Sequence, residues 1–332
     1  MQFKYQSYSA SHVGKKRTNN EDAYGELSVK QGKIFIVCDG MGGHIAGERA
    51  SAIAVQTILD YFKAVELTDI PESLKEAIQH ANKNIWDEAL NDPSLKGMGT
   101  TCVVVFTHTN GEIYIGHVGD SRCYLFTANK KLSTLTRDHS YVQFLIETGD
   151  VKPQEAFDHP SKNRILKALG IEATVTPEVI EQAFRLSSGD SLLLCTDGLN
   201  DMLRDQEIQE VLTNHSSPEA QATHLIDEAL AKGGKDNITL TLIQVNESPF
   251  ASEDTTTLTQ EKAPQNKQEK KKWIGLILIV LVLLVGLMYL FLPFNQESET
   301  AITPYKNNLQ DTLQKSYDDS SKRIKGENIP MH

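Results

Sequence analysis

The segment Ile34-Phe-Ile-Val-Cys-Asp-Gly-Met-Gly-Gly-His44 is highly informative, because an apolar run leads directly into an aspartate and a glycine. The run over 33–38 predicts a buried strand. A strand that ends in Asp39-Gly40 places a carboxylate at the edge of a sheet, and the glycine lets the backbone approach a cation closely. The stretch therefore predicts a strand end that contributes to a metal site.

Four other short acidic segments follow the same logic elsewhere in the chain. They are 17–22 (RTNNED), 119–122 (GDSR), 196–198 (TDG) and 235–237 (KDN). Carboxylates that converge without cysteine or paired histidine form an all-oxygen site, which suits Mg²⁺ or Mn²⁺. The five segments together predict such a centre.

The composition is that of a folded, acidic protein. Charged residues make up 23% of the 332 residues, and the formal net charge is -11. This balance argues against general nucleic-acid binding, since phosphate backbones select basic surfaces. Four cysteines without CxxC spacing lie in or beside apolar runs, which predicts buried thiols in a reducing compartment rather than zinc ligands: Cys38, Cys102, Cys123 and Cys195.

Residues 1–246 are expected to form one α+β domain, since runs of helices are separated from runs of strands. Pro71 is a start signal for the second helix. Residues 140–170, with Gly149 and two prolines, are expected to be irregular. Helices are predicted over 44–65, from Pro71, and near 205–213 and 218–231, and strands near 6–12, 22–29, 33–38, 101–107, 112–118, 122–127, 132–136, 173–184, 190–196 and 238–245.

Beyond this domain the composition changes twice. Residues 247–272 are rich in Ser, Thr, Glu, Gln and Lys, which is typical of a polar linker. Residues 273–294 contain no charged side chain and are long enough, at about 1.5 Å per residue, to cross a bilayer as a helix. Four lysines within 267–272 precede this segment, so the positive-inside rule predicts a cytoplasmic domain and an extracytoplasmic tail, 295–332. The sequence thus predicts a single-pass membrane protein.

Taken in order, the acidic segments resemble the PP2C (PPM) family of metal-dependent protein Ser/Thr phosphatases. The resemblance covers about residues 6–245 and also uses the Gly-Thr-Thr of 99–101. The Asp-Gly-Met-Gly-Gly-His form of 39–44 is similar to the bacterial branch. The resemblance implies a four-layer αββα sandwich, in which two antiparallel sheets are flanked by helices.

The same resemblance implies a role for each acidic segment. Asp39 would bridge two Mn²⁺ or Mg²⁺ ions, with help from the Gly40 carbonyl. The other metal ligands would be Asp197 and Asp236 directly, Glu21 and Asp22 through bound waters, and Asp120 at a third, weaker metal. Arg17 would bind the substrate phosphate, and a planar guanidinium does fit two phosphate oxygens at once.

The proton donor to the leaving group stays open at this point. Some branches of the family place a histidine directly after Asp-Gly, where this chain has Met41, which cannot donate a proton. His44 is close in sequence, but the start of a helix is as good an interpretation of it. The alternatives are His44, a metal-bound water, or solvent.

Two further interpretations concern partners. The resemblance implies phosphorylated proteins as substrates, including a Ser/Thr kinase and the substrates of that kinase. Lys162 and Arg164 lie where the family has a variable flap and could bind acidic or phosphorylated segments, although ordinary solvated charges are the simpler interpretation. A catalytically inactive binding module is the competing function, and the retained metal aspartates argue against it.

Overall fold

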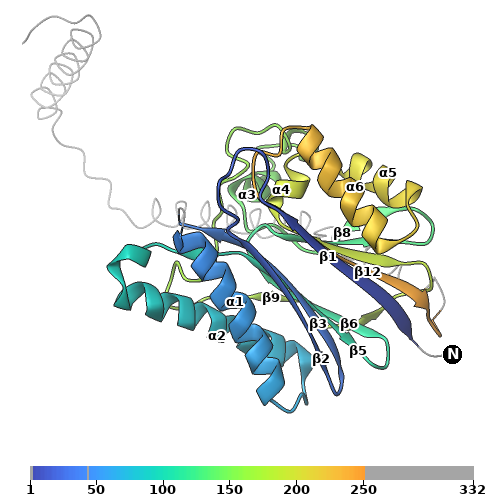
Figure 1. Ribbon diagram of the computed structural model, residues 1–332, viewed down its shortest axis with the longest axis horizontal. Coiled ribbons are helices and arrows are strands. Elements are labelled where there is room, and N and C mark those ends of the chain that lie inside the picture. Colours follow the sequence, from blue (N-terminus) through green and yellow to red (C-terminus); the bar gives the residue numbers. More distant parts are fainter. Residues whose placement is uncertain (1–2, 43–44, 251–332) are drawn as a thin grey trace, which may run out of the picture. The chain divides into compact units, whose positions relative to one another are not determined.

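Two antiparallel sheets carry the fold in the computed structural model, which describes residues 3–42 and 45–250 (Figure 1). The first sheet has the order β1-β12-β11-β7-β8. Its strands are β1 (Lys4–His12), β12 (Ile238–Glu247), β11 (Ser191–Cys195), β7 (Arg122–Phe126) and β8 (Leu132–Thr134).

The second sheet has the order β10-β6-β5-β3-β2, with β4 beside β3 and β9 beside β6. Its central strands are apolar at successive positions because both faces are covered. The strands are β10 (Phe184–Arg185), β6 (Glu112–Val118), β5 (Cys102–His108), β3 (Gly32–Met41), β2 (Asp22–Val29), β4 (Gly99–Thr100) and β9 (Glu178–Val179).

Helices cover the outer face of each sheet and complete four layers, as predicted (Figure 1). Helices α1 (Ile45–Ala64) and α2 (Ile70–Asn91) pack on the second sheet. Helices α4 (Asp197–Asn200), α5 (Asp205–Asn214) and α6 (Pro218–Ala231) pack on the first. The layers follow from alternation along a strand: in β3, Ile34 and Ile36 contact the helices, while Phe35 and Val37 face the other sheet.

Two helical turns and one short helix complete the described elements. The 3₁₀ turns are η1 (Pro93–Leu95) and η2 (Pro153–Glu155). Helix α3 (Tyr141–Thr148) begins after Ser140, whose hydroxyl accepts from the Gln143 N–H, and ends at Gly149 in the left-handed region. The four cysteines are free and buried, as predicted for thiols in apolar runs.

Three local predictions are wrong. Residues 140–170 contain α3, because Ser140 and Gly149 are sufficient helix caps even though prolines follow. The strand expected over 173–184 is reduced to the two-residue strands β9 and β10. The strand expected to stop at 38 continues through Asp39 to Met41, since Gly40 and Met41 pair with β4.

Most of the predictions for the C-terminal part of the chain concern residues outside those that the structure describes. Strand β12 ends at Glu247, close to the predicted domain end at 246. Within the described residues, no helix is long and apolar enough to cross a membrane. The rest of the predicted linker, the predicted span 273–294 and the tail 295–332 lie outside the described residues.

Candidate metal centre

The predicted metal ligands lie at strand ends of both sheets, and the fold brings these strand ends together. Asp22 begins β2 and is the direct cross-strand partner of Asp39 in β3. In the first sheet, Asp197 follows β11, Asp236 precedes β12 and Asp120 precedes β7. Since β11 and β7 are antiparallel neighbours of one another, the end of one strand lies beside the start of the other. Four of these aspartates influence one another electrostatically across the two sheets.

The pKa values of the converging carboxyls are raised. Burial, followed by neighbouring carboxylates, raises the pKa of Asp22 to about 7 and that of Asp197 to about 7. Burial also raises the pKa of Asp39 well above its ordinary value, with Asp197, Asp22 and Asp120 adding to the effect. Like charges at close range disfavour joint ionisation unless a cation lies between them.

Unsatisfied oxygen atoms mark the same place. Among the described residues, Oδ1 of Asp22, Oδ1 of Asp120 and Oδ1 of Asp197 are buried without a hydrogen-bond partner. A buried carboxylate oxygen without a donor is costly, and a hard divalent cation is the partner that such oxygens suit. The residues present therefore fit the metal ions that the sequence predicts.

Asp39 and Gly40 are fixed by their backbone contacts. The Asp39 N–H donates to Thr101 Oγ1 at 2.9 Å, and the Asp39 carbonyl accepts from the Thr101 N–H at 2.8 Å. A Cβ added to Gly40 would overlap the carbonyl oxygens of Glu21 and Gly47. Only glycine therefore allows β3 to pass this closely under the start of α1.

Glu21, which directly precedes β2, packs against the first turn of α1. Glu21 is only 7% exposed. Its carboxyl group lies against Gly47, and a Cβ added to Gly47 would overlap Oε2 of Glu21. Its carbonyl accepts from Ser51 Oγ at 2.6 Å. A carboxylate at a helix N-terminus is favoured by the helix dipole, so this placement is compatible with a carboxylate that reaches the metal centre only through water.

Arg17 lies at the solvent side of the centre. Its Nη2 donates to Asp236 Oδ2 at 2.7 Å, and its side chain is 47% exposed. Burial opposes the charge of Arg17, but Asp236, Glu21 and Asp39 outweigh it and raise the pKa of the guanidinium. The structure thus brings Arg17 into contact with Asp236, one of the predicted metal ligands.

Asn237 is a site residue whose role the sequence did not indicate. Its Oδ1 accepts from the Glu21 N–H at 2.8 Å. Its Nδ2 donates to the carbonyls of Val13 and Asn19, each at 2.9 Å. One buried side chain therefore ties both ends of the loop that carries Arg17 to the start of β12. The sequence offered one signal for this role, namely that Asn237 is a polar residue directly after Asp236, a predicted metal ligand.

Comparisons with known proteins agree with this geometry. Residues 10–232 match the family described as Protein phosphatase 2C. The chain belongs to the protein phosphatase 2C family. It is a protein serine/threonine phosphatase, like the serine/threonine phosphatase stp of Listeria welshimeri, to which it is 39% identical over 238 residues, covering 70% of this chain and 93% of that one.

Two solved structures are similar to this phosphatase. The serine/threonine phosphatase PstP/Ppp of Mycobacterium tuberculosis has a TM-score of 0.66 at 32% identity, over 73% of this chain and 99% of that one. The catalytic domain of serine/threonine protein phosphatase PstP, solved in complex with two manganese ions, has a TM-score of 0.64 at 31% identity, over 73% and 99% of the two chains.

The Asp120 segment of the phosphatase is not a simple hairpin turn with a local ion pair. Arg122 pairs with Asp138, at 2.6 Å from Nη2 to Oδ2, and not with Asp120. Asp120 is 6% exposed, and burial followed by Asp197 raises its pKa well above the ordinary value. Asp120 is therefore a buried carboxyl close to Asp197 and to the other acids of the candidate centre.

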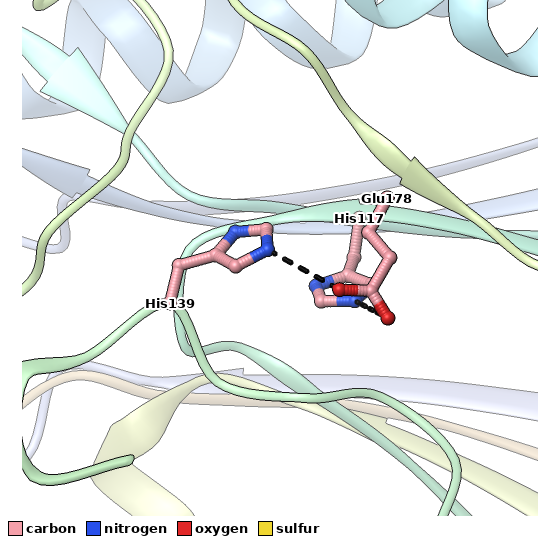
Figure 2. Close-up of side chains that lie close together, drawn as sticks. All are labelled: His117, His139 and Glu178. Atoms are coloured by element: carbon pink, nitrogen blue, oxygen red, sulfur yellow. Dashed lines mark ion pairs between the residues drawn. The ribbon is translucent and has the colours of Figure 1, made fainter. Parts of the chain in front are cut away.

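A cluster of His117, His139 and Glu178 lies at the end of β6, and His139 contacts Gly119 directly before Asp120 (Figure 2). The two imidazole rings stack with centroids 4.9 Å apart. Oε2 of Glu178 is 3.6 Å from Nε2 of His139, and Oε1 is 4.0 Å from Nε2 of His117. Three potential ligands this close resemble a metal site.

The hydrogen bonds of His139 argue for a different role. The Gly119 N–H donates to His139 Nδ1 at 3.1 Å, so the proton of the neutral ring lies on Nε2 and faces Glu178. A metal would need the lone pair of Nε2, which this tautomer does not offer. The His139 N–H also donates to the Gly119 carbonyl at 3.0 Å. The cluster therefore supports the Gly119–Asp120 turn of the phosphatase.

The flap residues of the phosphatase are already engaged. Lys162 Nζ lies 3.1 Å from Asp201 Oδ1. The Arg164 guanidinium lies 4.7 Å from the ring centroid of Tyr141 in α3. These contacts favour a structural role for both cations. His44 lies outside the described residues, so its predicted role in proton donation is untested.

Proposed function

We propose that this phosphatase hydrolyses phosphoserine and phosphothreonine in proteins by a reaction that depends on Mn²⁺ or Mg²⁺. The observation that supports the proposal is the convergence of buried, unsatisfied oxygens of Asp22, Asp120 and Asp197 beside Asp39. Asp39, Asp197 and Asp236 would hold two ions, with the Gly40 carbonyl, while Asp22 and Glu21 would act through water.

When bound, the divalent ions would supply Lewis acidity and make hydroxide available at neutral pH. Asp120 would hold a third ion. The choice between Mn²⁺ and Mg²⁺ is left to experiment, since both accept oxygen ligands of this kind.

Arg17 would bind the phosphate of the substrate. Within the described residues, only Nη2 of Arg17 donates to Asp236. The other N–H groups of the guanidinium are therefore available to phosphate oxygens, which a planar guanidinium is suited to bind. Asn237 ties the backbone on both sides of Arg17, and Asp236 contacts the guanidinium.

The proton donor is proposed to be His44, a metal-bound water or solvent. Met41 is part of β3 and has no proton to donate, so the position used by some other branches of the family is excluded here. A hydroxyl leaving group needs a proton as its bond to phosphorus breaks. A His44→Ala variant that loses activity on alkyl phosphates more than on p-nitrophenyl phosphate would identify His44, because p-nitrophenolate leaves without a proton.

Membrane attachment is a separate part of the proposal. The apolar segment 273–294 and the lysines before it support a single-pass protein with the phosphatase domain in the cytoplasm. A tether would raise the effective concentration of the phosphatase near membrane-bound partners, which we propose to include a Ser/Thr kinase and its substrates. Recovery of the full chain in the soluble fraction of its cells would refute the attachment.

The decisive experiment for the activity uses the purified full chain. Phosphate release from a phosphothreonine peptide is measured with Mn²⁺, with Mg²⁺ and with a chelator, for the wild type and for Asp39→Asn. The matched control is Asp60→Asn on the exposed face of α1, whose carboxylate contacts Gln56 and Lys63. We expect metal-dependent release that Asp39→Asn reduces to background and that Asp60→Asn leaves unchanged. Release that survives both chelation and Asp39→Asn would contradict the proposal.

A further inference from the structure

A group of exposed cations lies beside the candidate metal centre. Lys15, Lys16 and Arg17 form the exposed turn after β1, and Lys235 is exposed directly before Asp236. We refer to these four residues as the basic lip. Within the described residues, the side chains of the three lysines have no hydrogen bond or ion pair. In a chain of net charge -11, such a group is a local exception.

The two loops of the basic lip are fastened to each other. The Lys15 N–H donates to the Gly234 carbonyl at 2.7 Å, and a Cβ on Gly14 would overlap the Asp236 carbonyl oxygen. Figure 1 shows the loop after β1 close to the segment that leads into β12. The Asn237 side chain donates to the carbonyls at both ends of the first loop, Val13 and Asn19. The backbone therefore holds the two loops that carry the four charges next to one another.

The basic lip is close enough to the reaction to contact residues that flank a phosphorylated side chain. Lys16 and Lys235 are chain neighbours of Arg17 and Asp236, whose side chains are in contact, so each Cα is about 3.8 Å from that of its neighbour. An extended peptide advances about 3.3 Å per residue. The lysines are thus within reach of substrate positions a few residues from the phosphate.

We infer that the basic lip binds an acidic segment next to the phosphorylated residue and makes the phosphatase selective for such substrates. The inference rests on the proposed function and adds a substrate class to it. The groups recognised would be anionic oxygens, which carboxylate side chains and a second phosphate group both provide. The flap cations cannot provide this recognition without losing contacts, since Lys162 is paired with Asp201 and Arg164 lies over Tyr141.

The test compares three phosphothreonine peptides on the full chain at saturating Mn²⁺. The flanking residues are glutamine in the first, glutamate in the second, and glutamine with a second phosphothreonine in the third. Exposed ion pairs each change affinity by about 1.4- to 5-fold, so three lysines should favour the acidic peptides by about tenfold in kcat/KM. The preference should decrease as salt is raised.

The variants are designed to separate the lip from net charge. Lys15→Glu, Lys16→Glu and Lys235→Glu are combined, and the control combines Lys30→Glu, Lys130→Glu and Lys131→Glu. The control residues are exposed in the turns at the far ends of β2 and β7. A milder triple variant to glutamine covers a failure of the first to fold. Hydrolysis of p-nitrophenyl phosphate, which has no flanking residues, should stay within about twofold in every variant.

The outcomes are distinct. Loss of the preference in the lip variants, but not in the control, supports the inference; loss for one acidic peptide only identifies whether carboxylate or phosphate is the ligand. No preference in the wild type, or equal loss in the control, overturns it. Absence of hydrolysis of every substrate, including p-nitrophenyl phosphate, would instead refute the proposed function.

Discussion

His139 provides the sharpest test of how the fold prepares the metal centre. Its Nδ1 is the acceptor for the Gly119 N–H, directly before Asp120. In His139→Leu this buried N–H loses its acceptor. In His139→Asn the Oδ1 atom takes about the place of Nδ1 and keeps the acceptor, while the contact with Glu178 is lost. The pair of variants therefore separates the two contacts of one side chain.

The size of the effect follows from the lost hydrogen bond. A buried donor left without a partner costs about 1–3 kcal/mol, and the turn can avoid that cost only by moving. Movement displaces Asp120, whose Oδ1 is otherwise unsatisfied within the described residues. If the same free energy is subtracted from metal binding, the affinity of the Asp120 site falls by roughly 5- to 150-fold, since 1.4 kcal/mol is tenfold.

The assay measures Mn²⁺ binding, either by calorimetry or from the electron paramagnetic resonance signal of free Mn²⁺. Activity is therefore not the only readout. We expect His139→Leu to weaken one class of sites and His139→Asn to bind nearly as the wild type does. The melting temperature of both variants is measured in parallel. Equal Mn²⁺ binding in His139→Leu and the wild type, or equal weakening in the two variants, would refute the reasoning.

Three other predictions follow from the same structure. In the metal-free protein, the raised pKa values of Asp22 and Asp197, about 7 each against about 3.9 unfolded, mean that the folded state retains protons that the unfolded state has lost, so the free energy of unfolding should fall between pH 4 and 7. Thermal unfolding at several pH values checks this, and saturating Mn²⁺ should reverse the trend because metal binding releases protons. Gly198→Ala should destabilise by about 3 kcal/mol or more and weaken Mn²⁺ binding, since its Cβ would overlap the Asn237 carbonyl oxygen; unchanged melting would contradict this. Phe106→Ala, at a fully buried position in the helix-facing core, should cost about 3–5 kcal/mol while the Mn²⁺ affinity of the folded protein stays the same, which denaturant unfolding and metal titration measure together.

The sequence was sufficient for most of the secondary structure and for the acidic segments that the fold brings together. Strand periods and proline and glycine signals are local, so β5 and β6 or α5 and α6 could be located without a structure. The resemblance carried by the acidic segments named Asp39, Asp197 and Asp236 correctly as neighbours. Local signals were misleading for β9 and β10, which are strands only because β6 pairs with them.

Contacts between distant segments could be decided only by the tertiary structure. Nothing in the sequence indicates that Asn237 binds both ends of the Arg17 loop, that Arg122 pairs with Asp138, or that the Gly119 N–H donates to His139. Each is a hydrogen bond or ion pair between residues that come together when the two sheets and their connecting loops pack, and its geometry depends on that packing. The sequence by itself determined which side chains can hold a metal and bind phosphate. The packing of the sheets decided which backbone groups fix those side chains in place, because a carboxylate or an imidazole acquires its pKa, its tautomer and its partner from the groups that surround it.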